Sequence, residues 1–204
     1  MDYKTIANDG IVEEEIKKSR FICHLKRISR EEEGREYIAQ IKKQHHKANH
    51  SCSAIIVGDD GQIKRSSDDG EPSGTAGRPI LATIEGNELT NVLVLVNRWF
   101  GGVKLGTGGL VRAYGGCAGQ CLILAEKIEL IEKKQVIFSC YFNEWPILQY
   151  ELKHQQMEYT ENYTAEGVIV EAALQIHQID PLKLKLQDIT RGREQLKIVE
   201  PEHE

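Results

Sequence analysis

The residues best suited to chemistry lie in the glycine-rich segment 100–109. Five glycines fall between positions 101 and 109, and each would cost a helix or strand about 1 kcal/mol relative to alanine. The segment follows the apolar run Val92–Val96, which predicts a strand buried on both faces. It precedes a helical pattern for which Thr107 is the predicted N-cap. Backbone N–H groups at a helix start attract anions. A phosphate site is therefore predicted from the N–H groups of Thr107, Gly108 and Gly109 and the charges of Lys104 and Arg112.

The same glycines also have a packing interpretation. The predicted helix 107–126 contains Gly115, Gly116 and Gly119, and positions without side chains would let it lie close on the sheet. The segment matches neither a Walker A loop nor the dinucleotide-binding GxGxxG pattern. The two interpretations do not exclude each other, and the sequence leaves both open.

A polar loop at 67–79 places three acidic residues, Asp68, Asp69 and Glu71, beside Arg78. Carboxylates can hold Mg²⁺ or act as acid and base. Asp-Asp-Gly is also ordinary turn chemistry. Ion pairs with Arg78, Arg98, Lys104 or Arg112 are favoured over a ligand role, and no cofactor is predicted.

A second group of polar residues has types that zinc prefers: His45, His46, His50 and Cys52. The group spans the end of a predicted helix and the start of a strand, so convergence on one ion does not follow and no metal is predicted.

The chain has five cysteines and no CxxC pair. Cys117 and Cys121 lie one helical turn apart on an apolar face, which favours packing and a reducing compartment.

Basic residues concentrate between positions 17 and 47, where ten lysines and arginines face four glutamates. The net charge of −5 arises wholly in residues 134–204, since 19 basic and 19 acidic residues balance in residues 1–133. The stretch predicts a face for a polyanion, although charge runs are often only solvated surface. The residues expected to carry such a face are Lys17, Lys18, Arg20 and Arg27, with Arg78 and Arg98 adding charge near the loops.

The elements that must position these residues follow from periodicity and turn signals. Strands are predicted at 5–14, 19–28, 52–57, 62–66 and 91–98, and helices at 30–47, about 79–85 and 107–126. Ser29 and Glu32 are the predicted capping box of the first helix. These residues are expected to form one α/β domain, 1–133.

Residues 134–204 are expected to form a second, smaller domain. A strand from Val136 leads to a helix capped by Asn143, and a hairpin is predicted at 157–163 and 168–176. A helix is predicted to begin at Asp180-Pro181, and a last strand at 195–199. This βαββαβ order predicts a ferredoxin-like fold.

The forty per cent of hydrophobic residues can fill such cores, and no apolar run is long enough for a membrane span. Without a signal-like N-terminus, a cytoplasmic protein with no membrane partner is expected.

The two long motifs, 67–79 and 99–115, together resemble the signature of the YigZ/IMPACT family. The segments 18–22 and 50–54 fit the same pattern, and the remainder resembles the second domain of bacterial members. The resemblance implies a ribosomal-protein-S5-domain-2-like fold for the first domain. Metabolite kinases of that fold place nucleotide phosphates at a glycine-rich turn. Eukaryotic members of the family regulate translation, but they carry an additional N-terminal domain, whereas this sequence is expected to start directly with its first strand, so their kinase-pathway role is not carried over.

Together these observations favour a non-enzymatic cytoplasmic binding protein linked to translation, with RNA, the ribosome or a translation factor as partner. One alternative is a nucleotide- or phosphate-dependent transferase or hydrolase that uses Asp68, Asp69 and Lys104. Another is a protein-interaction module without nucleic acid. The sequence makes no prediction of oligomeric state.

Overall fold

The structure is a computed structural model that describes residues 2–199. The chain divides into two compact units, Met1–Leu130 and Ile131–Glu204. Each unit has a hydrophobic core of its own. Both units combine strands and helices, so the mixed α/β class predicted from the sequence is confirmed.

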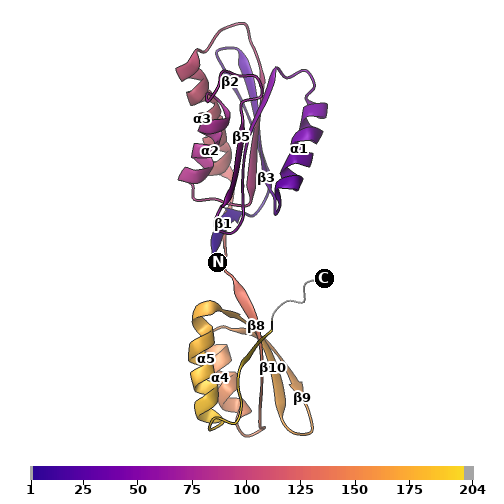
Figure 1. Cartoon of the computed structure of the whole chain (residues 1–204), viewed down its shortest axis with the longest axis vertical. Coiled ribbons are helices and arrows are strands. Elements are labelled where there is room, and N and C mark those ends of the chain that lie inside the picture. The colour runs from indigo at the N-terminus through magenta and orange to yellow at the C-terminus, as the bar shows by residue number, and fades with distance from the viewer. Residues whose placement is uncertain (1, 200–204) are drawn as a thin grey trace. The chain divides into compact units, whose positions relative to one another are not determined.

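The first unit is built on a five-stranded antiparallel sheet with the order β2-β3-β6-β4-β5. The strands are β2 (Gly10–Ile16), β3 (Ser19–Arg27), β6 (Val92–Trp99), β4 (His50–Val57) and β5 (Ile63–Ser67). Helices α2 (Gly77–Gly86) and α3 (Thr107–Leu124) cover one face, and α1 (Glu31–Gln44) covers the other (Figure 1). The central strand β6 is therefore buried on both faces, which confirms the interpretation of its apolar run.

Two short strands lie outside this sheet. β1 (Tyr3–Ile6) pairs antiparallel with β7 (Lys127–Leu130). The predicted strand 5–14 is thus wrong as a single element, because the chain breaks between residues 7 and 9 and its two parts join different sheets. β7 was not predicted, since its pairing joins residues far apart in the sequence.

The helix starts differ from the predicted caps. The N-cap of α3 is Gly106, whose φ of 72° suits glycine, and Thr107 is the first helical residue. No side chain caps this helix, so its first N–H groups are left for another acceptor. In α1 the backbone N–H of Ser29 donates to Glu33 rather than to Glu32, and the predicted capping box is wrong.

The glycines of α3 serve contact with α2, not with the sheet. A Cβ on Gly115 would lie 3.7 Å from Pro79, and one on Gly119 would lie 3.8 Å from Thr83. Gly116 is exposed, with open space around it. The side of α3 that packs on the sheet carries larger residues such as Tyr114 and Cys117. The close approach predicted between helix and sheet is therefore an approach between two helices.

The second unit has the element order β8 (Lys133–Cys140), α4 (Trp145–His154), β9 (Glu158–Tyr163), β10 (Val168–Gln175), α5 (Ile176–Ile189) and β11 (Lys197–Val199). Its antiparallel sheet has the strand order β11-β8-β10-β9, the arrangement of the predicted ferredoxin-like fold. Both helices lie on one face of the sheet (Figure 1). Leucines of the helices and valines of β8 and β10 form the core between them.

Two helix starts in this unit were predicted wrongly. The N-cap of α4 is Glu144, one residue after Asn143. α5 begins at Ile176, because Gln175 and Gln178 form a capping box there, and Pro181 lies inside the helix. Among the described residues, no helix combines the length and the apolar character that crossing a membrane requires.

Candidate functional site

A cavity of about 480 Å³ in the first unit joins the two long sequence motifs. It is lined by the start of β4, the acidic loop, the end of β6, the glycine-rich segment and the first turn of α3. The lining residues are Asn49, His50, Glu71, Pro72, Arg98, Phe100, Lys104, Leu105, Gly106, Thr107 and Leu110. Of the predicted phosphate-binding residues, Arg98, Lys104 and Thr107 thus share one cavity.

A buried ion pair forms part of this cavity. Arg98 donates to Glu71 over 2.6 Å, and the two side chains are only 6% and 4% exposed. The hydroxyl of Tyr114 donates to the same Glu71 oxygen over 2.8 Å. Burial raises the pKa of Tyr114, so this hydroxyl keeps its proton. Within residues 2–199, the Nε atom of Arg98 is buried without a hydrogen-bond partner.

His50 contributes an imidazole in a defined orientation. Its Nδ1 lies 2.9 Å from the carbonyl oxygen of Asp69. A carbonyl only accepts, so Nδ1 carries the proton and donates it. The Nε2 atom lies 3.9 Å from Glu71 Oε1, beyond hydrogen-bond distance. In the neutral ring, Nε2 therefore keeps a lone pair.

The other members of the histidine and cysteine group have structural contacts. Cys52 donates to the carbonyl of Asp68, and burial raises the pKa of its thiol to about 12. The ring of His45 packs against Trp99 and His24, and His46 is exposed. Across the described chain, no group of three or more His, Cys, Asp or Glu side chains is placed to hold a metal ion.

The acidic loop is held by contacts of its own. The Asp68 carboxylate accepts from the backbone N–H groups of Gly74, Ala76 and Gly77 at the start of α2. Burial alone would raise the pKa of Asp68, but these three donors outweigh it and the pKa is lowered. Asp69 accepts from Lys42 and from the N–H of Ser51, each over 2.6 Å. The three carboxylates of the loop are thus held by backbone N–H groups, by Lys42 and Arg98, and by the hydroxyl of Tyr114.

The glycine-rich segment places one aromatic ring beside the cavity. Phe100 is 46% exposed, and its backbone N–H donates to Asn49 Oδ1 over 2.8 Å. The guanidinium carbon of Arg98 lies 5.6 Å from the centre of the Phe100 ring. This ring offers a flat surface on which another ring could stack.

A turn with two exposed lysines lies against the same segment. Lys17 and Lys18 have φ values of 46° and 65°, and they connect β2 to β3. A Cβ on Gly101 would lie only 1.7 Å from the carbonyl oxygen of Lys18, so only glycine permits this approach. The two lysines and the glycine-rich segment are therefore close neighbours.

Other predicted residues lie apart from the cavity lining. Arg20 forms an ion pair with Glu13 and stacks over Trp99. Arg27 lies at the opposite end of β3, about 23 Å along the strand from Arg20. Exposed residues that do not line the cavity are Arg78, Gly108 and Arg112, and Gly109 is half-buried in the first turn of α3.

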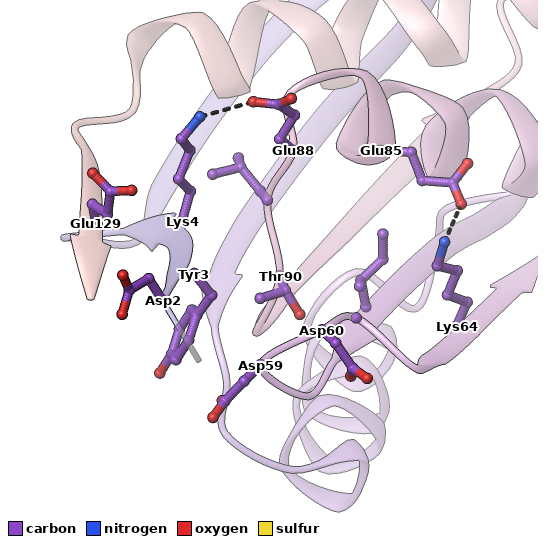
Figure 2. A pocket seen from close by; sticks show the side chains of 13 residues that line it. Asp2, Tyr3, Lys4, Asp59, Asp60, Lys64, Glu85, Glu88, Thr90 and Glu129 are labelled. Carbon is purple, nitrogen blue, oxygen red and sulfur yellow. Dashed lines mark hydrogen bonds and ion pairs between the residues drawn. The ribbon is translucent and has the colours of Figure 1, made fainter. Parts of the chain in front are cut away.

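A second cavity of the first unit, of about 430 Å³, has the opposite character. Figure 2 shows its two lysines, Lys4 and Lys64, engaged by Glu88 and Glu85. The further carboxylates in its lining are Asp2, Asp59, Asp60 and Glu129. This excess of negative charge disfavours a phosphate, and sequence spacing gave no sign of the cavity because its residues come from distant segments.

Comparison with known proteins gives consistent matches. The model of the Impact N-terminal domain matches residues 17–122. The chain is 37% identical to IMPACT family member YvyE of Bacillus subtilis over 198 residues, which cover 96% of this chain and 90% of that protein. It is 34% identical to IMPACT family member YigZ of Escherichia coli, covering 93% of this chain and 94% of that one.

A solved structure described as a hypothetical protein is 34% identical, has a TM-score of 0.66, and covers 98% of each chain. The Protein IMPACT homolog of Schizosaccharomyces pombe is 38% identical over 94 residues, or 44% of this chain and 33% of that protein. The family model spans the cavity and both long motifs, and together with the relatives of similar length it shows that the chain belongs to the IMPACT family.

Proposed function

We propose that this chain is a non-enzymatic cytoplasmic RNA-binding protein linked to translation, and that its cavity beside α3 holds one nucleotide of the RNA. One observation carries the proposal: Lys104, the uncapped start of α3 and the exposed ring of Phe100 border a single cavity. Family membership supports the link to translation. The expected partner is RNA, the ribosome or a translation factor.

The chemistry of the cavity suits a nucleotide. A phosphate would be bound by the ammonium of Lys104 and by backbone N–H groups of the first turn of α3, from Thr107 to Gly109. A base would stack on Phe100, as bases do on aromatic side chains of proteins that bind single strands. A volume of about 480 Å³ lies within the range of pockets for small ligands.

The basic edge would extend the contact beyond one nucleotide. Lys17 and Lys18 are exposed and lie against the glycine-rich segment, so they would meet the neighbouring phosphates. Arg20 would contribute less, because Glu13 neutralises it. Arg27 lies too far along β3 to reach the same phosphates.

The alternative of a transferase or hydrolase loses support from the geometry. It needs Asp68 and Asp69 at a ligand, but Asp68 caps α2 and Asp69 binds Lys42. Neither residue lines the cavity with Lys104. We expect no steady release of phosphate from ATP or GTP.

Fluorescence anisotropy with a labelled single-stranded RNA of about 12 nucleotides tests the proposal. Lys104→Ala and Phe100→Ala should each weaken binding about fivefold or more, since a charge-assisted contact or a stacked base contributes at least about 1 kcal/mol. Lys185→Ala, an exposed lysine on α5, is the matched control and should leave affinity unchanged.

Affinity should also fall as salt rises from about 50 to 200 mM, because phosphate contacts release counterions. Equal affinity of wild type, Lys104→Ala and Phe100→Ala would contradict the cavity as the site. Sedimentation with ribosomes, before and after RNase treatment, then shows whether the RNA is carried by ribosomes or whether the chain contacts a protein partner instead.

A further inference from the structure

The cavity contains hydrogen-bond acceptors as well as donors. Lys104 and the backbone at the start of α3 can only donate to a ligand. His50 and Glu71, by contrast, present acceptor atoms in the same lining. A ligand that satisfies both kinds of group needs an anionic part and a hydrogen-bond donor such as a hydroxyl.

His50 is held as an acceptor by the fold. The Nδ1–H of His50 donates to the carbonyl oxygen of Asp69. Asp69 is itself fixed, because its carboxylate accepts from Lys42 and from the N–H of Ser51. The lone pair of Nε2 therefore remains for a ligand, and no described side chain donates to it within hydrogen-bond distance. Arg98 and Tyr114 both donate to the Oε1 atom of Glu71, which is thereby held in the buried ion pair. His50 Nε2 is an acceptor in the same lining that no described side chain uses.

We infer that the cavity distinguishes ribose from deoxyribose, with His50 Nε2 accepting a hydrogen bond from the 2′-hydroxyl of the bound nucleotide. The inference rests on the proposed function, because it names the sugar of the nucleotide whose phosphate lies at α3. The 2′-hydroxyl is the group by which a protein tells RNA from DNA at a single site. No proton is transferred in this contact, because the hydroxyl only donates a hydrogen bond.

Three oligonucleotides of one sequence test the inference: RNA, DNA and 2′-O-methyl RNA, measured by anisotropy at pH 8. Wild type should bind RNA about fivefold more tightly than either of the others, as expected for one neutral hydrogen bond. The methylated strand keeps an RNA-like sugar but has no 2′-hydroxyl to donate. Weaker binding of this strand would therefore show that the preference comes from the hydrogen bond and not from the shape of the sugar.

His50→Phe keeps a flat ring and removes the acceptor. It should lower the affinity for RNA to that for DNA and leave the affinity for DNA unchanged. Lys104→Ala is the matched control, because it contacts the phosphate that all three strands share and should weaken all three equally. The wild-type comparison of strands needs no variant, so equal affinities would overturn the inference even if His50→Phe misfolds.

The outcomes separate the two proposals. Equal affinity of wild type for all three strands would overturn the inference about His50 and leave RNA binding at the cavity standing. A wild-type preference for RNA that His50→Phe retains, in a folded variant, would also overturn it. Failure of wild type to bind any strand at low salt would contradict the proposed function itself.

Discussion

Removing the Glu71 carboxylate should be among the most destabilising single changes in the first unit. In Glu71→Ala, Arg98 would remain buried at 6% exposure without its counter-charge, and the Tyr114 hydroxyl would lose its acceptor. Breaking one side of a buried ion pair costs about 3–5 kcal/mol, and the unpaired hydroxyl adds about 1 kcal/mol. We therefore expect the free energy of unfolding to fall by at least about 3 kcal/mol.

Urea denaturation followed by tryptophan fluorescence can measure this loss in the intact chain. The chain has two tryptophans, Trp99 in the first unit and Trp145 in the second. A Trp145→Phe background leaves Trp99 as the sole reporter, so the transition of the first unit is observed without the second. Glu85→Ala removes the partner of the exposed ion pair with Lys64 and serves as the control, with an expected loss below about 1 kcal/mol.

The double variant Glu71→Leu with Arg98→Met refines the test. Replacing a buried pair by apolar groups costs less than breaking it, so the double variant should be more stable than Glu71→Ala. A loss in Glu71→Ala no larger than that of Glu85→Ala would refute the reasoning, because it would mean that Arg98 finds solvent or another partner when Glu71 is absent.

Substitutions at four further positions test other contacts. Asp68→Ala should cost about 1–2 kcal/mol by removing the acceptor for three N–H groups in the loop before α2 and at its first residue, and Asp68→Asn should restore part of it in the same urea assay. Gly101→Ala should lower the melting temperature because its Cβ would meet the Lys18 carbonyl. Gly116→Ala should raise stability by about 0.5–1 kcal/mol, since that helical position faces open space. A more stable Gly101→Ala and a less stable Gly116→Ala would contradict the assigned contacts. Burial, and secondarily the charge of His45, lowers the pKa of His24 to about 4. As pH falls from about 6.5 to 4, His24 is therefore protonated in the unfolded chain but not in the folded one. Above this window the free energy of unfolding is unaffected by His24, and through the window it decreases by at most about 3 kcal/mol. His24→Leu should flatten that part of the pH–stability curve, and an unchanged slope would show that other groups cause it.

Local sequence signals predicted the elements that depend on local pattern. The apolar run at Val92–Val96 forms the central strand β6, and the predicted strands 52–57 and 62–66 correspond to β4 and β5. The order of strands and helices after residue 133 was enough for the ferredoxin-like arrangement. The strands follow from short runs of neighbouring residues, and the fold of the second unit follows from the order of its elements.

Features set by distant contacts could not be predicted. The partner of Asp69 is Lys42, which lies 27 residues earlier on α1, and no spacing rule selects it over nearer arginines. The pairing of β1 with β7 joins opposite ends of the first unit. His50 was predicted as a member of a histidine group, but its relation to Glu71 and the cavity depends on how β4 and the acidic loop pack together.

The amide NMR spectrum of the ¹⁵N-labelled chain, recorded during titration with single-stranded RNA, tests the central claim most directly. The account predicts that the largest shifts fall on Phe100, Lys104 and the N–H groups of Thr107, Gly108 and Gly109, with smaller shifts at Lys17 and Lys18. Amides beside the acidic cavity, such as Asp59 and Asp60, should not move. Shifts confined to residues 131–199, with the start of α3 unchanged, would contradict the account.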